Sequence, residues 1–181
     1  MTPAGDSSVG GAQALRDQIG TLHAAAYGWA LTCCRRDHHE AEEVLQDSYA
    51  RVMSGRAKFD GRSGFKTWLF GVIRRSAMER RRRSLIRKLS FRQYQGESSP
   101  SVPPAPDDAV SRTARAAAVA DALPALAVRQ REVLHLVFYE GLSVGEAAET
   151  MGVSLGTARL HYHRGKKRLV KLLRERGFAH G

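Results

Sequence analysis

Basic side chains at helical spacing are the residues of this chain best placed to do chemistry, and the chemistry that they suit is recognition of nucleic acid. Toward the carboxyl end, four residues would share the exposed face of one helix: Leu160, His163, Arg164 and Lys167. The opposite face would carry an apolar stripe of Ala158, Tyr162, Leu169 and Leu172. Because the major groove accepts a helix with an apolar back and a basic front, this segment predicts contact with DNA.

A helix-turn-helix is predicted over Leu142–Arg168. Ser143, with Glu146 three residues later, is a capping-box start for the first helix, and Ser154 is an N-cap candidate for the second. Gly152 between them supplies the backbone freedom that a tight turn needs. The unit makes duplex DNA the first partner to consider.

The charge of the chain agrees with such a partner. It has 29 Lys and Arg against 18 Asp and Glu, a formal net charge of +11 over 181 residues. A field of this sign favours a polyanion. No apolar run approaches the roughly 20 residues of a membrane-spanning helix, and the N-terminus lacks the layout of a signal peptide. We therefore expect a cytoplasmic protein without membrane insertion.

The pattern of helix and turn signals divides the chain into two small all-α domains joined by a flexible linker. Residues 1–16 are small, polar and glycine-rich, and we expect a disordered tail there. Residues 17–95 have a helical pattern, residues 96–110 are rich in Pro and Ser, and residues 111–176 are helical again. A linker of this kind is long enough to place the domains on separate DNA segments.

Within the first domain, Ala41–Met53 is amphipathic by its spacing. Val44, Leu45 and Tyr49 belong to the apolar stripe. The outward positions are Glu43, Gln46, Asp47 and Arg51. Spacing alone predicts that this outward face is a solvated helix surface, as such patterns usually indicate.

The segment that follows mixes aromatic and basic residues. In chain order these are Phe65, Lys66, Trp68, Phe70, Arg74 and Arg75. The combination suits stacking on unpaired bases and tracking of a phosphate backbone. A hydrophobic core with a basic rim explains it equally well. The run Arg80–Arg83 adds positive charge without sequence preference.

These motifs, in this order, resemble those of the extracytoplasmic-function (ECF) group of bacterial RNA polymerase sigma factors, which have only sigma regions 2 and 4. Ala41–Met53 resembles the family's core-polymerase-binding segment. Phe59–Phe70 resembles its loop and helix that read and melt the −10 element. Leu123–Leu134 resembles the opening of region 4, and Val153–Arg159 resembles the entry of its recognition helix.

The resemblance implies an alternative sigma factor that directs core polymerase to specific promoters and opens the −10 region. Region 4 would bind the −35 duplex through Ser154, Thr157, Arg159, Leu160, His161, His163, Arg164, Lys166, Lys167 and Arg168. Region 2 would read and melt the −10 element through Asp60, Gly61, Arg62, Ser63, Phe65, Lys66, Trp68, Arg74 and Arg75. Core polymerase would be bound through Glu43, Gln46, Asp47 and Arg51.

The partners that the resemblance implies are the β′ subunit and β flap of core polymerase, promoter DNA and an anti-sigma factor. The anti-sigma factor would hold the protein inactive, at the inner membrane face where that factor is membrane-bound. No cofactor and no small-molecule substrate are expected.

Several positions depart from the family pattern. Arg75 stands where the family usually has Asn, and Gly71 where it often has a basic residue. Leu160 and His161 replace the common Ser and Arg, and Gly165 replaces Ala. A mid-helix Gly costs about 1 kcal/mol relative to Ala, so we expect a bend near the end of the recognition helix. Leu160 cannot donate a hydrogen bond but suits a thymine methyl.

Catalytic motifs are not legible in the sequence, which has no P-loop and no Ser/His/acid or paired-carboxylate arrangement, so we expect a protein that is not an enzyme. Cys33 and Cys34, followed by His38 and His39, form the one cluster with metal-ligand chemistry. Zinc sites usually space their cysteines two to four apart, so two reduced cytosolic thiols are expected instead of a metal site.

Two other functions remain open. A free-standing helix-turn-helix regulator would dimerise on palindromic sites. That function gives the aromatic and basic segment of the first domain no role. A sigma mimic, a decoy that binds a regulatory protein, is favoured slightly by Leu160 and His161. The retained Arg159, Arg164 and Trp68 argue against it.

Overall fold

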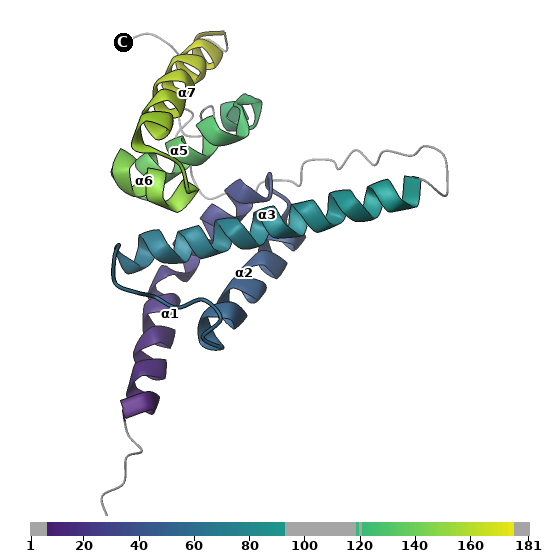
Figure 1. Cartoon of the computed structure of the whole chain (residues 1–181). Helices are drawn as coiled ribbons and strands as arrows, with labels where there is room; N and C mark the ends of the chain where they lie inside the picture. The colour runs from purple at the N-terminus through teal and green to yellow at the C-terminus, as the bar shows by residue number, and fades with distance from the viewer. Residues whose placement is uncertain (1–6, 93–118, 120, 176–181) are drawn as a thin grey trace, which may run out of the picture.

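The computed structural model describes residues 7–92, 119 and 121–175. These residues form two groups of helices and no strand, which confirms the expected all-α architecture (Figure 1). The first group contains α1 (Ser7–Cys33), α2 (His38–Met53) and α3 (Phe65–Arg92). The second contains the 3-10 helix η1 (Leu123–Ala125), α5 (Val128–Phe138), α6 (Val144–Met151) and α7 (Leu155–Glu175). The predicted linker, 96–110, lies outside the described residues.

Helix α1 begins earlier than the sequence suggested. It starts at Ser7, so the part of the predicted tail from residue 7 to residue 16 is helical. Leu15 and Ile19 explain the difference, because both pack against the hydrophobic core. Ala14, Leu15 and Arg16 are also strong helix formers, which the glycine content of the tail obscured.

A tight turn reverses the chain between α1 and α2. Arg35 and Arg36 both have left-handed backbone conformations, with φ of 57° and 68°. This conformation costs non-glycine residues roughly 1–2 kcal/mol each. Asp37 then caps α2, because its side chain accepts a hydrogen bond from the Glu40 amide at 2.9 Å. The cap stabilises the entry into α2 and so helps to hold the turn.

One hydrophobic core runs through both helical groups. Trp29 of α1 and Phe70 of α3 are fully buried, with near-parallel rings 6.0 Å apart. The indole Nε1 of Trp29 donates to the Phe70 carbonyl at 2.9 Å. Leu136 and Met151 of the second group belong to the same buried cluster. The two domains expected on a tether are therefore docked against one another, with α6 on α3 and α5 on α1.

Gly165 has a packing role that the sequence did not indicate. Helix α7 runs unbroken through it from Leu155 to Glu175, and Gly165 is buried. A Cβ atom at this position would lie 3.2 Å from Cδ1 of Leu134 on α5. The glycine thus lets α7 approach α5 closely, which offsets its low helix propensity.

Candidate nucleic-acid interface

The helix-turn-helix is present as predicted. The Ser143 hydroxyl accepts from the Glu146 amide at 3.2 Å, while the Glu146 carboxylate accepts from the Ser143 amide at 2.8 Å. Gly152 ends α6 in a left-handed conformation with φ of 62°. The Ser154 hydroxyl then accepts from the Thr157 amide at 3.2 Å. These caps fix the angle at which α7 leaves the turn.

Helix α7 presents a basic face to solvent and an apolar face to the protein. Its buried positions are Ala158, Gly165 and Leu172. The predicted −35 residues that are exposed are Ser154, Arg159, Leu160, His163, Arg164, Lys166, Lys167 and Arg168, while Thr157 and His161 are half-buried. Leu160 is 46% exposed in the middle of this face. The arrangement matches a recognition helix whose basic face also carries exposed apolar side chains, Leu160 and Val170 among them.

The loop between α2 and α3 displays the predicted −10 residues. Asp60, Gly61 and Arg62 are exposed, and Ser63 is half-buried. Asp60 orders the loop, because its carboxylate accepts from the Arg62 amide at 3.2 Å and lies 3.3 Å from the Arg62 guanidinium. Gly61 has φ of 73°, a conformation that suits glycine.

An aromatic cluster lies at the base of this loop. The rings of Phe59, Phe65 and Trp68 are 5.3–5.4 Å apart by centroid. Phe59 is 42% exposed and was not singled out from the sequence. Phe70, by contrast, is fully buried, so the core interpretation is right for that residue. The surface available for base stacking comprises Phe59, Phe65 and Trp68.

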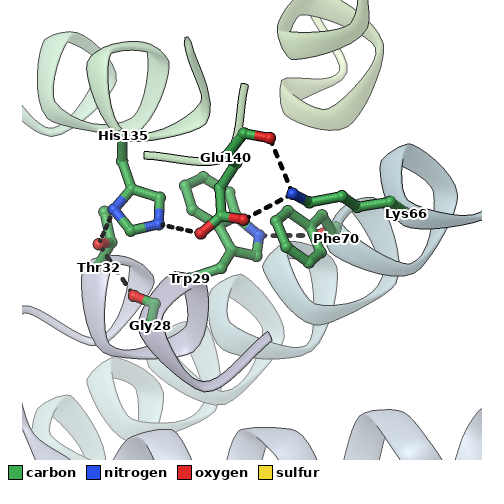
Figure 2. A network of polar contacts seen from close by, with 7 residues as sticks. All are labelled: Gly28, Trp29, Thr32, Lys66, Phe70, His135 and Glu140. Carbon is green, nitrogen blue, oxygen red and sulfur yellow. Dashed lines mark hydrogen bonds and ion pairs between the residues drawn. The ribbon is translucent and has the colours of Figure 1, made fainter. Parts of the chain in front are cut away.

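Lys66 lies in a polar network that joins the two helical groups (Figure 2). Its Nζ is 2.8 Å from the Glu140 carboxylate and 2.8 Å from the Glu140 carbonyl oxygen. On the other side, Nε2 of His135 is 3.2 Å from the same carboxylate, and Nδ1 lies 3.0 Å from the Thr32 hydroxyl. Burial acts to raise the pKa of Glu140, but hydrogen bonds from His135 and Lys66 outweigh it and hold that pKa below its ordinary value.

Arg74 is also used in docking. It is only 6% exposed, and its Nη1 donates to the Met151 carbonyl at 2.8 Å. Its Nε lies 3.3 Å from the Glu132 carboxylate. Of the three cations expected to hold the separated strand, Arg75 alone is exposed, because Lys66 and Arg74 contact the second helical group. The sequence did not predict the pairing of Lys66 and Arg74 with acidic residues, because Glu132 and Glu140 belong to no recognisable motif.

The four residues predicted on the outward face of α2 differ in their contacts: two are exposed to solvent and two form ion pairs with α3. Gln46 and Asp47 are exposed. Glu43, in contrast, pairs with Arg80 of α3, and Arg51 donates to Glu79 at 2.6 Å. The hydrogen bond from Arg51 lowers the pKa of Glu79. Of the four predicted polymerase contacts, two therefore also tie α2 to α3.

The cysteines are held as thiols by their surroundings. Burial raises the pKa of Cys34 to about 12, and it raises the pKa of Cys33 well above its ordinary value. In the described part of the chain, no three His, Cys, Asp or Glu side chains are grouped to hold a metal ion. None of the helices in residues 7–92 and 121–175 combines the length and apolarity that crossing a membrane requires.

Comparison with known proteins identifies both helical groups. Residues 19–85 match the family described as Sigma-70 region 2, and residues 116–169 match Sigma-70, region 4. The ECF RNA polymerase sigma factor SigX of Bacillus subtilis (strain 168) is 31% identical over 146 residues, covering 77% of this chain and 75% of the relative. The RNA polymerase sigma factor YlaC of the same strain is 28% identical over 159 residues, covering 86% of this chain and 92% of the relative.

A solved structure has a similar fold. The sigma factor RpoE from Bartonella quintana, crystallised in complex with the anti-sigma factor NepR, matches with a TM-score of 0.69 at 23% identity. The match covers 90% of this chain and 98% of that one. Regions 2 and 4 occur in order, and the matches cover most of the length of both relatives. The chain therefore belongs to the sigma-70 family, in the ECF group of alternative RNA polymerase sigma factors.

Proposed function

We propose that this sigma factor divides promoter recognition between its two helical groups, with α7 on the −35 duplex and the α2–α3 loop on the −10 element. The observation that carries the proposal is that two surfaces of different chemistry lie on different groups. The face of α7 is basic and suits duplex DNA. The base of the loop is aromatic and suits unstacked bases. Polymerase supplies the catalysis, and the protein itself performs none.

On the −35 element, α7 would lie in the major groove with its N-terminus toward a phosphate. Ser154 and Thr157 open the helix, where amide groups and the helix dipole favour an anion. Arg159, Leu160 and His161 follow within the first two turns, the part of a recognition helix that reaches base edges. The phosphate contacts would come from His163, Arg164, Lys166, Lys167 and Arg168, which lie further along the same helix.

On the −10 element, the Asp60–Phe65 loop would receive a base extruded from the duplex. Trp68 and Phe59 would stack on the separated strand, and Arg75 would contact its phosphates. Lys66 and Arg74 could join them only after region 4 leaves, because both now contact it. The docked arrangement is therefore proposed as the DNA-free state.

Core polymerase would bind the outward face of α2, chiefly at Gln46 and Asp47. Glu43 and Arg51 would act there as positioning residues as well, since their bonds to Arg80 and Glu79 fix α2 on α3. The sigma factor RpoE of similar fold was crystallised with an anti-sigma factor. By extension, we propose that an anti-sigma factor restrains this protein in the cytoplasm.

Replacement of Trp68 tests the assignment of strand opening to region 2. Trp68→Ala should reduce open-complex formation by holoenzyme about tenfold or more, since stacking on one base contributes roughly 1–3 kcal/mol. A template with a pre-melted −10 bubble should restore the variant. Phe138→Ala, which removes an exposed aromatic ring from region 4, is the matched control. Equal loss on both templates would assign Trp68 to the core and contradict the proposal.

A further inference from the structure

A cavity of about 360 Å³ lies where region 2 and region 4 meet. Region 2 contributes Thr32, Arg35 and Arg36, at the end of α1 and in the turn after it. Region 4 contributes η1 and the start of α5, including Arg131. No acidic residue is among the described residues that line it. The cavity is therefore a basic pocket, separate from the DNA-binding face of α7.

Arg131 is the most informative residue of this pocket. It is 9% exposed, and neither its Nε nor its Nη2 has a hydrogen-bond partner among the described residues. Burial, together with the nearby Arg35, lowers the pKa of Arg131 below its ordinary value. A buried guanidinium with unfilled donors is unfavourable, and an anion in the pocket would remove that penalty once a small rotation of the Arg131 side chain turned these donors toward it.

The start of helix α5 adds a second group of donors. Ala127, its N-cap residue, supplies no side-chain hydrogen bond to the first turn. The amides of Val128 and Arg129 have no intrahelical partner, and the positive end of the helix dipole lies there. Ala127 and Val128 both line the cavity. An uncapped helix N-terminus beside a buried arginine is suited to a phosphate group.

We propose that this pocket binds a small phosphorylated molecule, with its phosphate between Arg131, Arg35 and the N-terminus of α5. Guanidinium groups that line one cavity, next to a helix N-terminus, match a multiply charged anion better than a single carboxylate. Pro124 and Leu126 form an apolar part of the wall, against which the rest of the molecule would lie. The volume is within the range of small-ligand sites.

Binding there would hold the two regions together, because its donors come from both. In that arrangement Lys66 and Arg74 contact Glu140 and the Met151 carbonyl, away from DNA. The ligand would thus favour the DNA-free state. This consequence rests on the proposed function, whereas binding itself does not.

Titration of the full-length protein with inorganic pyrophosphate tests the site directly, by calorimetry and by amide chemical shifts. We expect saturable binding, with shifts at Arg35, Val128 and Arg129. Arg131→Gln and Arg35→Gln should each weaken it about tenfold, the loss of one charge-assisted hydrogen bond. Arg35 lies on an exposed turn, so its variant tests the site without altering the core. Arg87→Gln, an exposed change on α3, should leave binding unchanged.

Three results would overturn the proposal. The first is equal binding of pyrophosphate by wild type and Arg35→Gln. The second is shifts confined to the basic face of α7, which would mark non-specific binding of a polyanion. The third is tighter binding of citrate than of pyrophosphate at matched ionic strength, which would make the ligand a carboxylate. Because the readout is binding, none of these results bears on promoter recognition.

Discussion

Nζ of Lys66 lies 2.8 Å from the carboxylate of Glu140, although 74 positions separate the two residues in the chain. A cation from the segment resembling the −10 reader is thus neutralised by an acidic residue of region 4. The Glu140 side chain is 7% exposed and that of Lys66 is 29% exposed. The pair is therefore largely shielded from water, and removal of one partner leaves the other charge without its partner.

Replacing Glu140 should loosen the docked arrangement. Glu140→Gln removes the charge that faces both Lys66 and His135, at an expected cost of about 1–3 kcal/mol in the free energy of docking, less than for a fully buried pair. Small-angle scattering of the free protein should show a larger radius of gyration. Glu149→Gln, an exposed change on α6, should not alter it. An unchanged radius of gyration in Glu140→Gln would show that this ion pair does not hold the two regions together.

The same pair gives the docking a pH dependence of known sign. Because the pKa of Glu140 is lowered in the folded protein, its stabilising effect is present above its unfolded value, near 4.3, and is lost as the pH falls through the lowered value. The radius of gyration from small-angle scattering should therefore differ between wild type and Glu140→Gln at pH 7, and the two values should converge in acid.

The fold was largely predictable because its signals are local. The capping box of Ser143 and Glu146, and Gly152 in its left-handed turn, depend on neighbours within a few residues. The docking of the two regions was not predictable, because Trp29, Glu132 and His135 acquire their roles only from residues distant in the sequence. Phe70 and Trp68 show the same limit, since one is core and the other half-buried although both lie in one aromatic pattern.

Gly165 should be required for the packing of α7 on α5. Gly165→Ala places a Cβ 3.2 Å from Leu134, so we expect destabilisation despite the better helix propensity of Ala. Gly156→Ala is the matched control, because its Cβ would meet only the Ser154 hydroxyl, at 4.0 Å, and should be neutral or stabilising by about 0.5–1 kcal/mol. Urea unfolding measures both. If Gly165→Ala is the more stable of the two, the close approach of α7 and α5 is not needed.

Asp47 should be a contact for core polymerase. Asp47→Lys reverses an exposed charge on α2, and repulsion at a docked surface can cost several kcal/mol. We expect loss of co-purification with core polymerase and an unchanged circular dichroism spectrum. Glu42→Lys makes the same charge change at a neighbouring exposed position outside the predicted set. Retention of polymerase by Asp47→Lys would place the interface elsewhere.

Leu160 and Arg164 should contribute to DNA binding in different ways. Leu160→Ala should weaken binding at one −35 position by roughly 1 kcal/mol, one or two lost methyl contacts, with the salt dependence unchanged. Arg164→Ala should weaken all promoters alike and reduce the salt slope by about one. Holoenzyme binding to single-base −35 variants at several salt concentrations separates them. If the base profile of Leu160→Ala is the same as that of wild type, Leu160 contacts no base, and a protein partner for this side chain would be favoured instead.

Reconstituted transcription tests the central claim most directly. The full-length protein is mixed with core polymerase and a linear template carrying a promoter identified from transcripts that rise on overexpression of the protein. We predict a transcript from one defined start site, dependent on the protein and on no ATP-hydrolysing activator. A tight, specific footprint by the protein alone, with no transcript when core polymerase is added, would contradict the account and favour a free-standing regulator.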